Sequence, residues 1–226
     1  MHNLDHVSEQ IRKAFEARNT ARDKALAQAR LLTRACALAI RAVHREDEAA
    51  MQAHLAEARD LVAALRRELA DFPDLYYAGY TQDALKEYAE ASITCALIRR
   101  QPLPSLDDLD LPPATYLNGL AEAIGELRRR CLDILRHGYS TEVEHLLGHM
   151  DDIFSVLVTM DFPDAITNGL RRQTDVARSL IERTRGDITF SLRGEHLERS
   201  IQRLSAQLSG ATPPDSPRPR PSPEEE

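Results

Sequence analysis

The sequence predicts an all-α protein built as a bundle of long helices. Ala, Leu, Arg and Glu dominate, aromatic residues make up 5% and tryptophan is absent, a balance that favours packed helices over sheets. Only 9 glycines and 12 prolines interrupt 226 residues, and residues 7–44 contain neither. With 42% hydrophobic residues the chain can bury a substantial core. One helical domain over residues 1–209 is therefore expected.

The N-terminal half should contain three long helices that end at helix breakers. The first covers about residues 7–44, and the second covers about residues 47–69 and stops before Phe72-Pro73. The third covers about residues 76–100 and ends before Pro102. An acidic loop that is not expected to be structured on its own follows, with Asp107, Asp108 and Asp110.

The C-terminal half should contain three more helices. The fourth covers about residues 114–136. The fifth opens at a capping box of Thr141 and Glu144 and ends near residue 162. The sixth is expected to be capped by Asp164, to bend near Gly186 and to reach residue 209. Residues 210–226 are rich in Pro, Ser and Glu, which predicts a disordered tail.

Charge and cysteine content restrict the environment and the partners. The net charge of −7 argues against a uniformly basic nucleic-acid binder, so a polyanion would have to meet a local basic patch. The cysteines Cys36, Cys95 and Cys131 are odd in number and lie in apolar runs, which predicts buried thiols in a reducing compartment. Neither a signal peptide nor an apolar run of ~18 residues is apparent, so a cytoplasmic protein without membrane association is expected.

Two carboxylates lie one turn apart in the third expected helix. Glu87 and Glu90 share a face with Tyr80 and Asp83, and residues 91–98 are too apolar for an ordinary solvated surface. An acidic stripe that enters a buried helix requires a compensating cation, and Mg²⁺ or Mn²⁺ suits oxygen ligands. The alternative is a pair of surface carboxylates whose charge is balanced by neighbouring cations, Lys86, Arg99 or Arg100.

Further acidic candidates lie in the fourth and fifth expected helices. Glu122 and Glu126 are four residues apart, and Asp151 and Asp152 precede an apolar run. On the fifth expected helix, four side chains at spacings of three, four and three residues have the spacing of zinc or iron ligands. The alternative is that they form an exposed amphipathic face. This histidine stripe consists of Glu142, His145, His149 and Asp152. The chain has no HExxH, no glycine-rich phosphate loop and no Ser or Cys nucleophile motif, so a hydrolase with a covalent nucleophile is poorly supported.

A row of arginines follows one face of the first expected helix. At 100° per residue these side chains fall within about 60° of one another, and Arg12 projects onto the same face if the helix is straight. The row consists of Arg30, Arg34, Arg41 and Arg45. Such a row suits a phosphate backbone, since each guanidinium can bind phosphate oxygens in a bidentate manner. The alternative is a solvated face that pairs with nearby acidic residues such as Glu46 and Asp47.

Several separated motifs in the same order resemble the translin and translin-associated factor X (TRAX) family. The first is Glu87-Tyr88-Ala89-Glu90-Ala91, which is similar to the Glu-Tyr-x-Glu-Ala of TRAX. The second runs from Tyr116-Leu117 through Gly125-Glu126-Leu127 to Arg129, and the third is Asp152-x-Phe154. Residues 161–187 also resemble the C-terminal helix of the prokaryotic members. The resemblance extends from about residue 12 to about residue 207.

The resemblance implies a subunit of about seven helices that assembles into a hollow homo-oligomer, typically an octamer. Translin proper binds single-stranded RNA or DNA and lacks the paired glutamates, whereas the TRAX branch uses them in a Mg²⁺-dependent ribonuclease site. By this resemblance, one or two Mg²⁺ ions, with Mn²⁺ as a substitute, would be held by Glu87, Glu90, Glu126 and Asp152. The RNA-binding residues would be Arg30, Arg34, Arg41, Arg45 and Arg129.

One position departs from the family pattern. The family has glycine between the aspartate and the phenylalanine of the fifth helix, whereas this chain reads Asp151-Asp152-Ile153-Phe154. Asp152 is assigned as the ligand by its position relative to Phe154, with Asp151 as the alternative. Three functions follow: an endoribonuclease for single-stranded RNA, a non-catalytic single-stranded RNA- or DNA-binding protein, and a helical scaffold without a nucleic-acid role.

Overall fold

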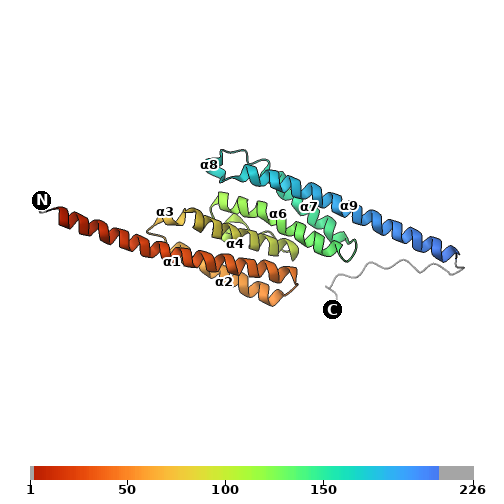
Figure 1. Ribbon diagram of the computed structural model, residues 1–226, viewed down its shortest axis with the longest axis horizontal. Helices are drawn as coiled ribbons and strands as arrows, with labels where there is room; N and C mark the ends of the chain where they lie inside the picture. Colours follow the sequence, from red (N-terminus) through yellow and green to blue (C-terminus); the bar gives the residue numbers. More distant parts are fainter. Residues whose placement is uncertain (1–2, 209–226) are drawn as a thin grey trace.

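The computed structural model describes residues 3–208, which form α-helices joined by short connections and contain no strand (Figure 1). This confirms the all-α prediction. The six long helices are α1 (Leu4–His44), α2 (Glu48–Glu68), α4 (Gly79–Ile98), α6 (Pro113–Leu135), α7 (Thr141–Leu157) and α9 (Leu170–Leu208). Three single-turn helices lie between them, α3 (Pro73–Tyr76), α5 (Leu106–Leu109) and α8 (Asp164–Thr167).

Helices α4 and α6 form the centre of the bundle. Helices α1 and α2 pack on the α4 side, and α7 and α9 pack on the α6 side (Figure 1). Because α4 has neighbours on several sides, residues 91–96 are all buried, as the apolar run predicted. Large fully buried side chains from all six long helices fill the core, among them Leu32, Leu65, Leu85, Ile124, Met150 and Leu170.

The expected ends of most long helices lie within three residues of the observed ones. The end of α7 is an exception, since the helix stops at Leu157 and not near residue 162. There the Thr159 hydroxyl donates a hydrogen bond of 2.7 Å to the Val156 carbonyl, so a side chain competes with the helical backbone. The capping residue of α7 is Ser140, whose hydroxyl accepts from the Glu142 amide, and not Thr141.

Three further features of the connecting segments differ from the expectations. The last helix is continuous through Gly186 and is broken earlier, at Asn168 and Gly169, whose φ angles of 51° and 84° are left-handed. Pro163, without a side-chain cap, precedes α8, so Asp164 does not cap it. The acidic segment is also not a plain loop, because Ser105 and Asp108 form a capping box that opens α5.

The three cysteine side chains are buried and free, as expected. Burial raises the pKa of Cys95 and Cys131 to about 12. None of the helices within residues 3–208 has the length and apolar character needed to cross a membrane. The predicted tail, residues 210–226, lies outside the described residues.

The two terminal helices extend beyond the bundle at opposite ends (Figure 1). Residues 4–20 of α1 are all exposed, and the last buried residue of α9 is Ile188. We refer to residues 4–20 as the α1 arm and to residues 190–208 as the α9 arm. Both arms expose large apolar side chains, for example Phe15 and Leu208, which are 67% and 82% exposed.

Candidate metal centre and nucleic-acid interface

A close approach of α6 to α4 builds the candidate metal centre. A Cβ atom on Gly119 would lie 2.5 Å from the Ala89 Cβ atom and 2.8 Å from the Lys86 carbonyl oxygen. Only glycine therefore fits between the two backbones at this position. Glu122 follows Gly119 by one helical turn, so the same contact brings Glu122 to the face of α4 that carries Glu87 and Glu90.

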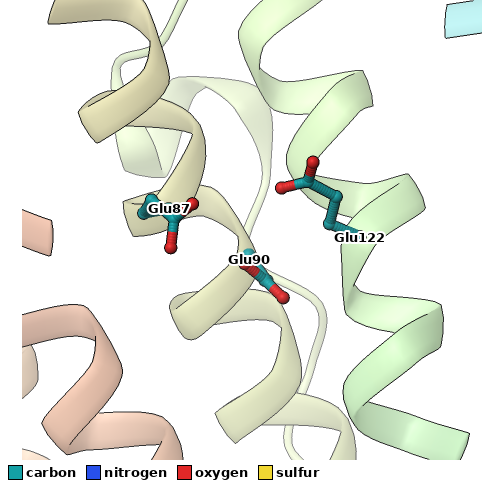
Figure 2. A group of neighbouring side chains, drawn as sticks. All are labelled: Glu87, Glu90 and Glu122. Atoms are coloured by element: carbon teal, nitrogen blue, oxygen red, sulfur yellow. The ribbon is translucent and has the colours of Figure 1, made fainter. Parts of the chain in front are cut away.

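Three glutamates meet at this contact and form the acidic triad, Glu87, Glu90 and Glu122. One carboxylate oxygen from each lies within 4.8 Å of the others, and all three residues are half-buried. Glu87 and Glu90 project from α4, and the Glu122 carboxylate reaches toward them from α6 (Figure 2). The paired glutamates predicted from the sequence are thus confirmed as neighbours in a partly buried environment.

Burial and mutual repulsion change the protonation of the triad. Burial first, and then the charges of Glu87 and Glu122, raise the pKa of Glu90 to about 8. Burial likewise raises the pKa of Glu87, with the Glu122 and Asp83 charges acting in the same direction against the opposing effect of Lys86. At neutral pH the metal-free triad therefore retains a proton, which a divalent cation would displace.

Glu122 also has two protein partners. The Lys86 ammonium group donates a hydrogen bond of 2.8 Å to Glu122 Oε1, and the Gln173 amide of α9 donates to the same oxygen at 2.8 Å. Burial alone would lower the pKa of Lys86, but the hydrogen bond and the charge of Glu122 raise it above its ordinary value. Lys86 therefore remains an ammonium ion at the triad.

Glu126 lies one turn beyond Glu122, but its carboxylate is directed to other partners. His44 Nε2 and Glu126 Oε2 share a hydrogen bond of 2.6 Å, and the His44 side chain is only 4% exposed. This hydrogen bond lowers the pKa of Glu126. The Glu126 charge in turn contributes to the raised pKa of Glu90, so Glu126 lies close enough to influence the triad without joining it.

The α7 aspartates lie outside the triad. Asp152 is exposed, and Asp151 forms an ion pair of 3.0 Å with Arg185 of α9. The metal role of Asp152 stays a prediction. The histidine stripe is not gathered into a metal site among the described residues, since the acidic triad is the one group of three ligand atoms found there. Glu142 is paired with Arg130, and it lines a cavity of about 270 Å³ together with His145 and His149.

The arginine row lies on the exposed surface of α1. Arg30, Arg34, Arg41 and Arg45 are all exposed, and none of them forms an ion pair with another residue in the part of the chain that the structure describes. The solvated face of the alternative is thus observed, whereas its pairing with Glu46 and Asp47 is not found within the described residues. Arg129 is also exposed, but it contacts Glu126 at 3.4 Å.

An open groove lies between Arg30 of the arginine row and Glu87 of the triad. It has a volume of about 440 Å³ and lies between α1 and α4, with Arg30 and Thr33 on one side and Tyr80, Asp83 and Glu87 on the other. Cys36 is buried farther along α1, and the charges of Glu87 and Glu90 add to the effect of burial in raising its pKa. A phosphate held by Arg30 would therefore lie next to the acidic residues.

The sequence indicated Glu122 as an acidic candidate but not as a partner of Glu87 and Glu90. Gly119, one turn earlier, is the signal that could have identified it, because a glycine within an otherwise regular helix often marks a close helix contact. The donor set of the acidic triad fits Mg²⁺ or Mn²⁺, which prefer hard carboxylate oxygens, and three ligands leave coordination positions for water.

Comparisons with known proteins identify the family. No model of a known protein family matches the sequence. An uncharacterized protein of Methanocaldococcus jannaschii is 31% identical over 194 residues, which cover 85% of this chain and 86% of that protein. The archaeal protein AfC3PO is 32% identical with a TM-score of 0.76, covering 82% of this chain and 97% of AfC3PO.

A second structure of AfC3PO, in complex with duplex RNA, gives a TM-score of 0.77 at 31% identity and covers 82% of this chain and 96% of AfC3PO. Apo-NeC3PO from Nematostella shares the fold, with a TM-score of 0.73 at 21% identity over 84% of this chain and 98% of that protein. The chain belongs to the translin and TRAX family, the family of the C3PO proteins.

Proposed function

We propose that this protein is a Mg²⁺-dependent endoribonuclease that cleaves single-stranded RNA inside a hollow homo-oligomer. The observation that carries this proposal is the acidic triad, whose carboxylate oxygens lie within 4.8 Å of one another, and whose Glu87 shares a groove with Arg30. The complex of the relative AfC3PO with duplex RNA supports RNA as the ligand. The two proteins are 31% identical, so the ligand class is expected to be shared.

The residues of the chain have separate roles in this proposal. Glu87, Glu90 and Glu122 would hold the metal ion, and Glu126 and Asp152 are further candidate ligands. When bound, the ion supplies Lewis-acid chemistry that lowers the pKa of water and neutralises charge on a leaving oxygen. The exposed guanidinium groups of α1 would hold the RNA backbone through its phosphates, independently of base sequence. Arg30 would position a phosphate in the groove beside Glu87.

A non-catalytic protein that binds single-stranded RNA or DNA is the second candidate. The observation that favours it is the ion pair between Lys86 and Glu122, which already compensates part of the triad charge without a metal ion. A binding protein of this kind would use the same arginine row, so an RNA-binding assay does not distinguish the two functions. An RNA-cleavage assay distinguishes them.

We further propose that the subunit assembles into a hollow oligomer, with an octamer as the expected state. The two arms support this proposal, because they carry exposed apolar side chains that a single subunit leaves in water. The enclosed cavity would restrict access to the acidic triad, which predicts a preference for single strands over folded RNA.

A nuclease assay on the purified chain tests the function. End-labelled single-stranded RNA, single-stranded DNA and duplex RNA would be incubated with Mg²⁺ or with EDTA, and both binding and cleavage would be measured. We expect Mg²⁺-dependent internal cleavage of single-stranded RNA. In the Glu90→Gln variant the rate should fall on the order of 10²-fold or more while RNA binding is retained.

Glu68→Gln is the matched control, since it makes the same chemical change at an exposed position of α2. Cleavage should be unchanged in this variant. Binding without cleavage in the unsubstituted protein would establish the second candidate. A Glu90→Gln variant that cleaves at the parental rate would show that the acidic triad is not the nuclease site.

A further inference from the structure

We propose that Lys86 is a built-in counter-ion of the acidic triad, which holds Glu122 in the metal-free protein and competes with a divalent cation for it. This inference rests on the proposed metal site and concerns its regulation. It predicts that Lys86 lowers the affinity of the site for metal ions and sets the ion concentration at which the site fills.

The position of Lys86 is the first argument. Lys86 precedes Glu87 on α4, yet its ammonium group reaches across to α6 and donates to Glu122 Oε1 at 2.8 Å. Both side chains are 22% exposed, so this ion pair is less screened by water than a pair on the open surface. The Gln173 amide contacts the same oxygen from α9, which fixes the carboxylate from a second side.

The second argument is that, among the described residues, no second cation forms an ion pair with a triad member. Within residues 3–208, Lys86 is the one basic side chain paired with a triad member. The basic residues that follow Glu122 on α6 have other acidic partners: Arg128 pairs with Asp187, and Arg129 pairs with Glu126. Compensation of the triad charge by the protein therefore depends on one ammonium group.

The chemistry of lysine is the third argument. Basic residues of this chain are almost all arginine, and its lysines are Lys13, Lys24 and Lys86. A guanidinium forms rigid bidentate contacts with a carboxylate, whereas an ammonium group sits on a flexible four-carbon stem and is easily rehydrated. Lys86 can therefore leave Glu122 when an ion with two positive charges enters. Since the two cations repel each other, each weakens the binding of the other.

Metal-binding measurements on the full-length protein test this inference. Mn²⁺ is the probe, and isothermal titration calorimetry gives its dissociation constant. Lys86→Met removes the charge at nearly constant length, and we expect it to bind Mn²⁺ about tenfold or more tightly than the unsubstituted protein. Lys24→Met is the matched control, because Lys24 is exposed on α1 and has no acidic partner within the described residues. It should leave the dissociation constant unchanged.

Thermal unfolding provides a second readout that does not depend on activity. In EDTA the Lys86→Met variant should unfold at a lower temperature than the unsubstituted protein, because the triad has lost its counter-ion. With saturating Mn²⁺ it should gain more in melting temperature than the unsubstituted protein does. Lys86→Gln retains a hydrogen-bond donor for Glu122 and should also bind Mn²⁺ more tightly than the unsubstituted protein. This variant replaces Lys86→Met if the methionine variant does not fold.

The outcomes separate this inference from the proposed metal site. If Mn²⁺ binds the unsubstituted protein, and Glu90→Gln removes that binding, but the Lys86 variants bind equally or more weakly, the counter-ion role is wrong and the metal site stands. If Mn²⁺ binds neither the unsubstituted protein nor the Lys86 variants, both proposals are overturned. If Mn²⁺ binds the Lys86 variants but not the unsubstituted protein, the Lys86 ammonium group competes strongly enough to exclude the ion.

Discussion

At the scale of single residues, the acidic triad is an arrangement that costs stability. Three half-buried carboxylates lie together and only Glu122 is paired with an ammonium group, so burial and repulsion both disfavour full ionisation. An arrangement of this kind is expected where a protein binds a cation and not where it only maintains its fold. The raised pKa of Glu90 is its measurable consequence.

The stability of the metal-free protein should therefore fall as the pH rises through neutrality. Glu90 has an ordinary pKa of 4.5, and the fold raises it to about 8, so between these values the folded state binds more protons than the unfolded state. The contribution is fully present below pH 4.5 and is lost as the pH rises through about 8. Melting temperatures in EDTA from pH 6 to pH 9 measure the effect.

Glu90→Gln should flatten this pH dependence, because the amide is neutral throughout. The Glu68→Gln control should retain it. Two results would contradict the assignment of the titration to Glu90. One is a melting temperature of the unsubstituted protein that does not change with pH. The other is the same slope of melting temperature against pH in Glu90→Gln and Glu68→Gln.

At the scale of helices, the sequence predicted the elements well but not their mutual register. The ends of α2, α4 and α6 follow from Pro, Gly and the apolar pattern, and those signals are local. The single-turn helix α5 has a local signal in the capping box of Ser105 and Asp108, but the packing of Leu109 and Leu111 on the core is not encoded locally. For the same reason Glu87 and Glu90 could be identified as neighbours on one helix, while Glu122 could be added only once the contact at Gly119 was known.

Gly119→Ala should separate α6 from α4 and weaken the metal site. The new Cβ atom would meet a backbone carbonyl and the Ala89 side chain well below contact distance, so the helices must shift. Overpacking costs about 1–3 kcal/mol, which exceeds the gain of about 1 kcal/mol in helix propensity. Chemical denaturation and Mn²⁺ titration should show lower stability and lower affinity.

Gly125→Ala on the same helix provides the matched control. Nothing lies within 4 Å of its added Cβ atom, so only the propensity gain should remain. Equal effects of the two substitutions would show that the close approach does not determine the position of Glu122.

Arg34→Ala combined with Arg41→Ala should weaken RNA binding to a similar extent for all sequences. Both side chains are exposed and lie outside the core, so the fold should be retained. Loss of two phosphate contacts should reduce the slope of log affinity against log salt concentration by about 1.4 for single strands. Filter-binding titrations at several salt concentrations measure this slope.

The double variant Arg59→Ala and Arg67→Ala makes the same change on exposed positions of α2 and should leave both affinity and slope unchanged. If the α1 variant retained the parental affinity and slope, the RNA path would not follow the arginine row. The arginines that follow Glu126 on α6 would then be tested next.

At the scale of the whole molecule, the isolated subunit exposes apolar side chains to water on both of its arms. The α1 arm exposes Leu4, Val7, Ile11 and Phe15, and the α9 arm exposes Leu197, Ile201, Leu204 and Leu208. The α9 residues recur at spacings of four, three and four, the pattern of a coiled-coil seam. A helix of 39 residues with such a seam gains stability by burying it against another helix.

Leu197→Asp combined with Leu204→Asp should therefore reduce the mass of the particle in solution. Light scattering on the unsubstituted protein should give several times the chain mass of 25.4 kDa, and the variant should give a smaller assembly, because a carboxylate in the seam cannot be buried without a partner.

Gln202→Asp with Ala206→Asp adds the same charge on the opposite face of the helix and should leave the mass unchanged. Removal of residues 210–226, which have almost no apolar side chains, should not alter it either. A monomeric unsubstituted protein would exclude the hollow oligomer, and with it the argument that the acidic triad is accessible only to single strands.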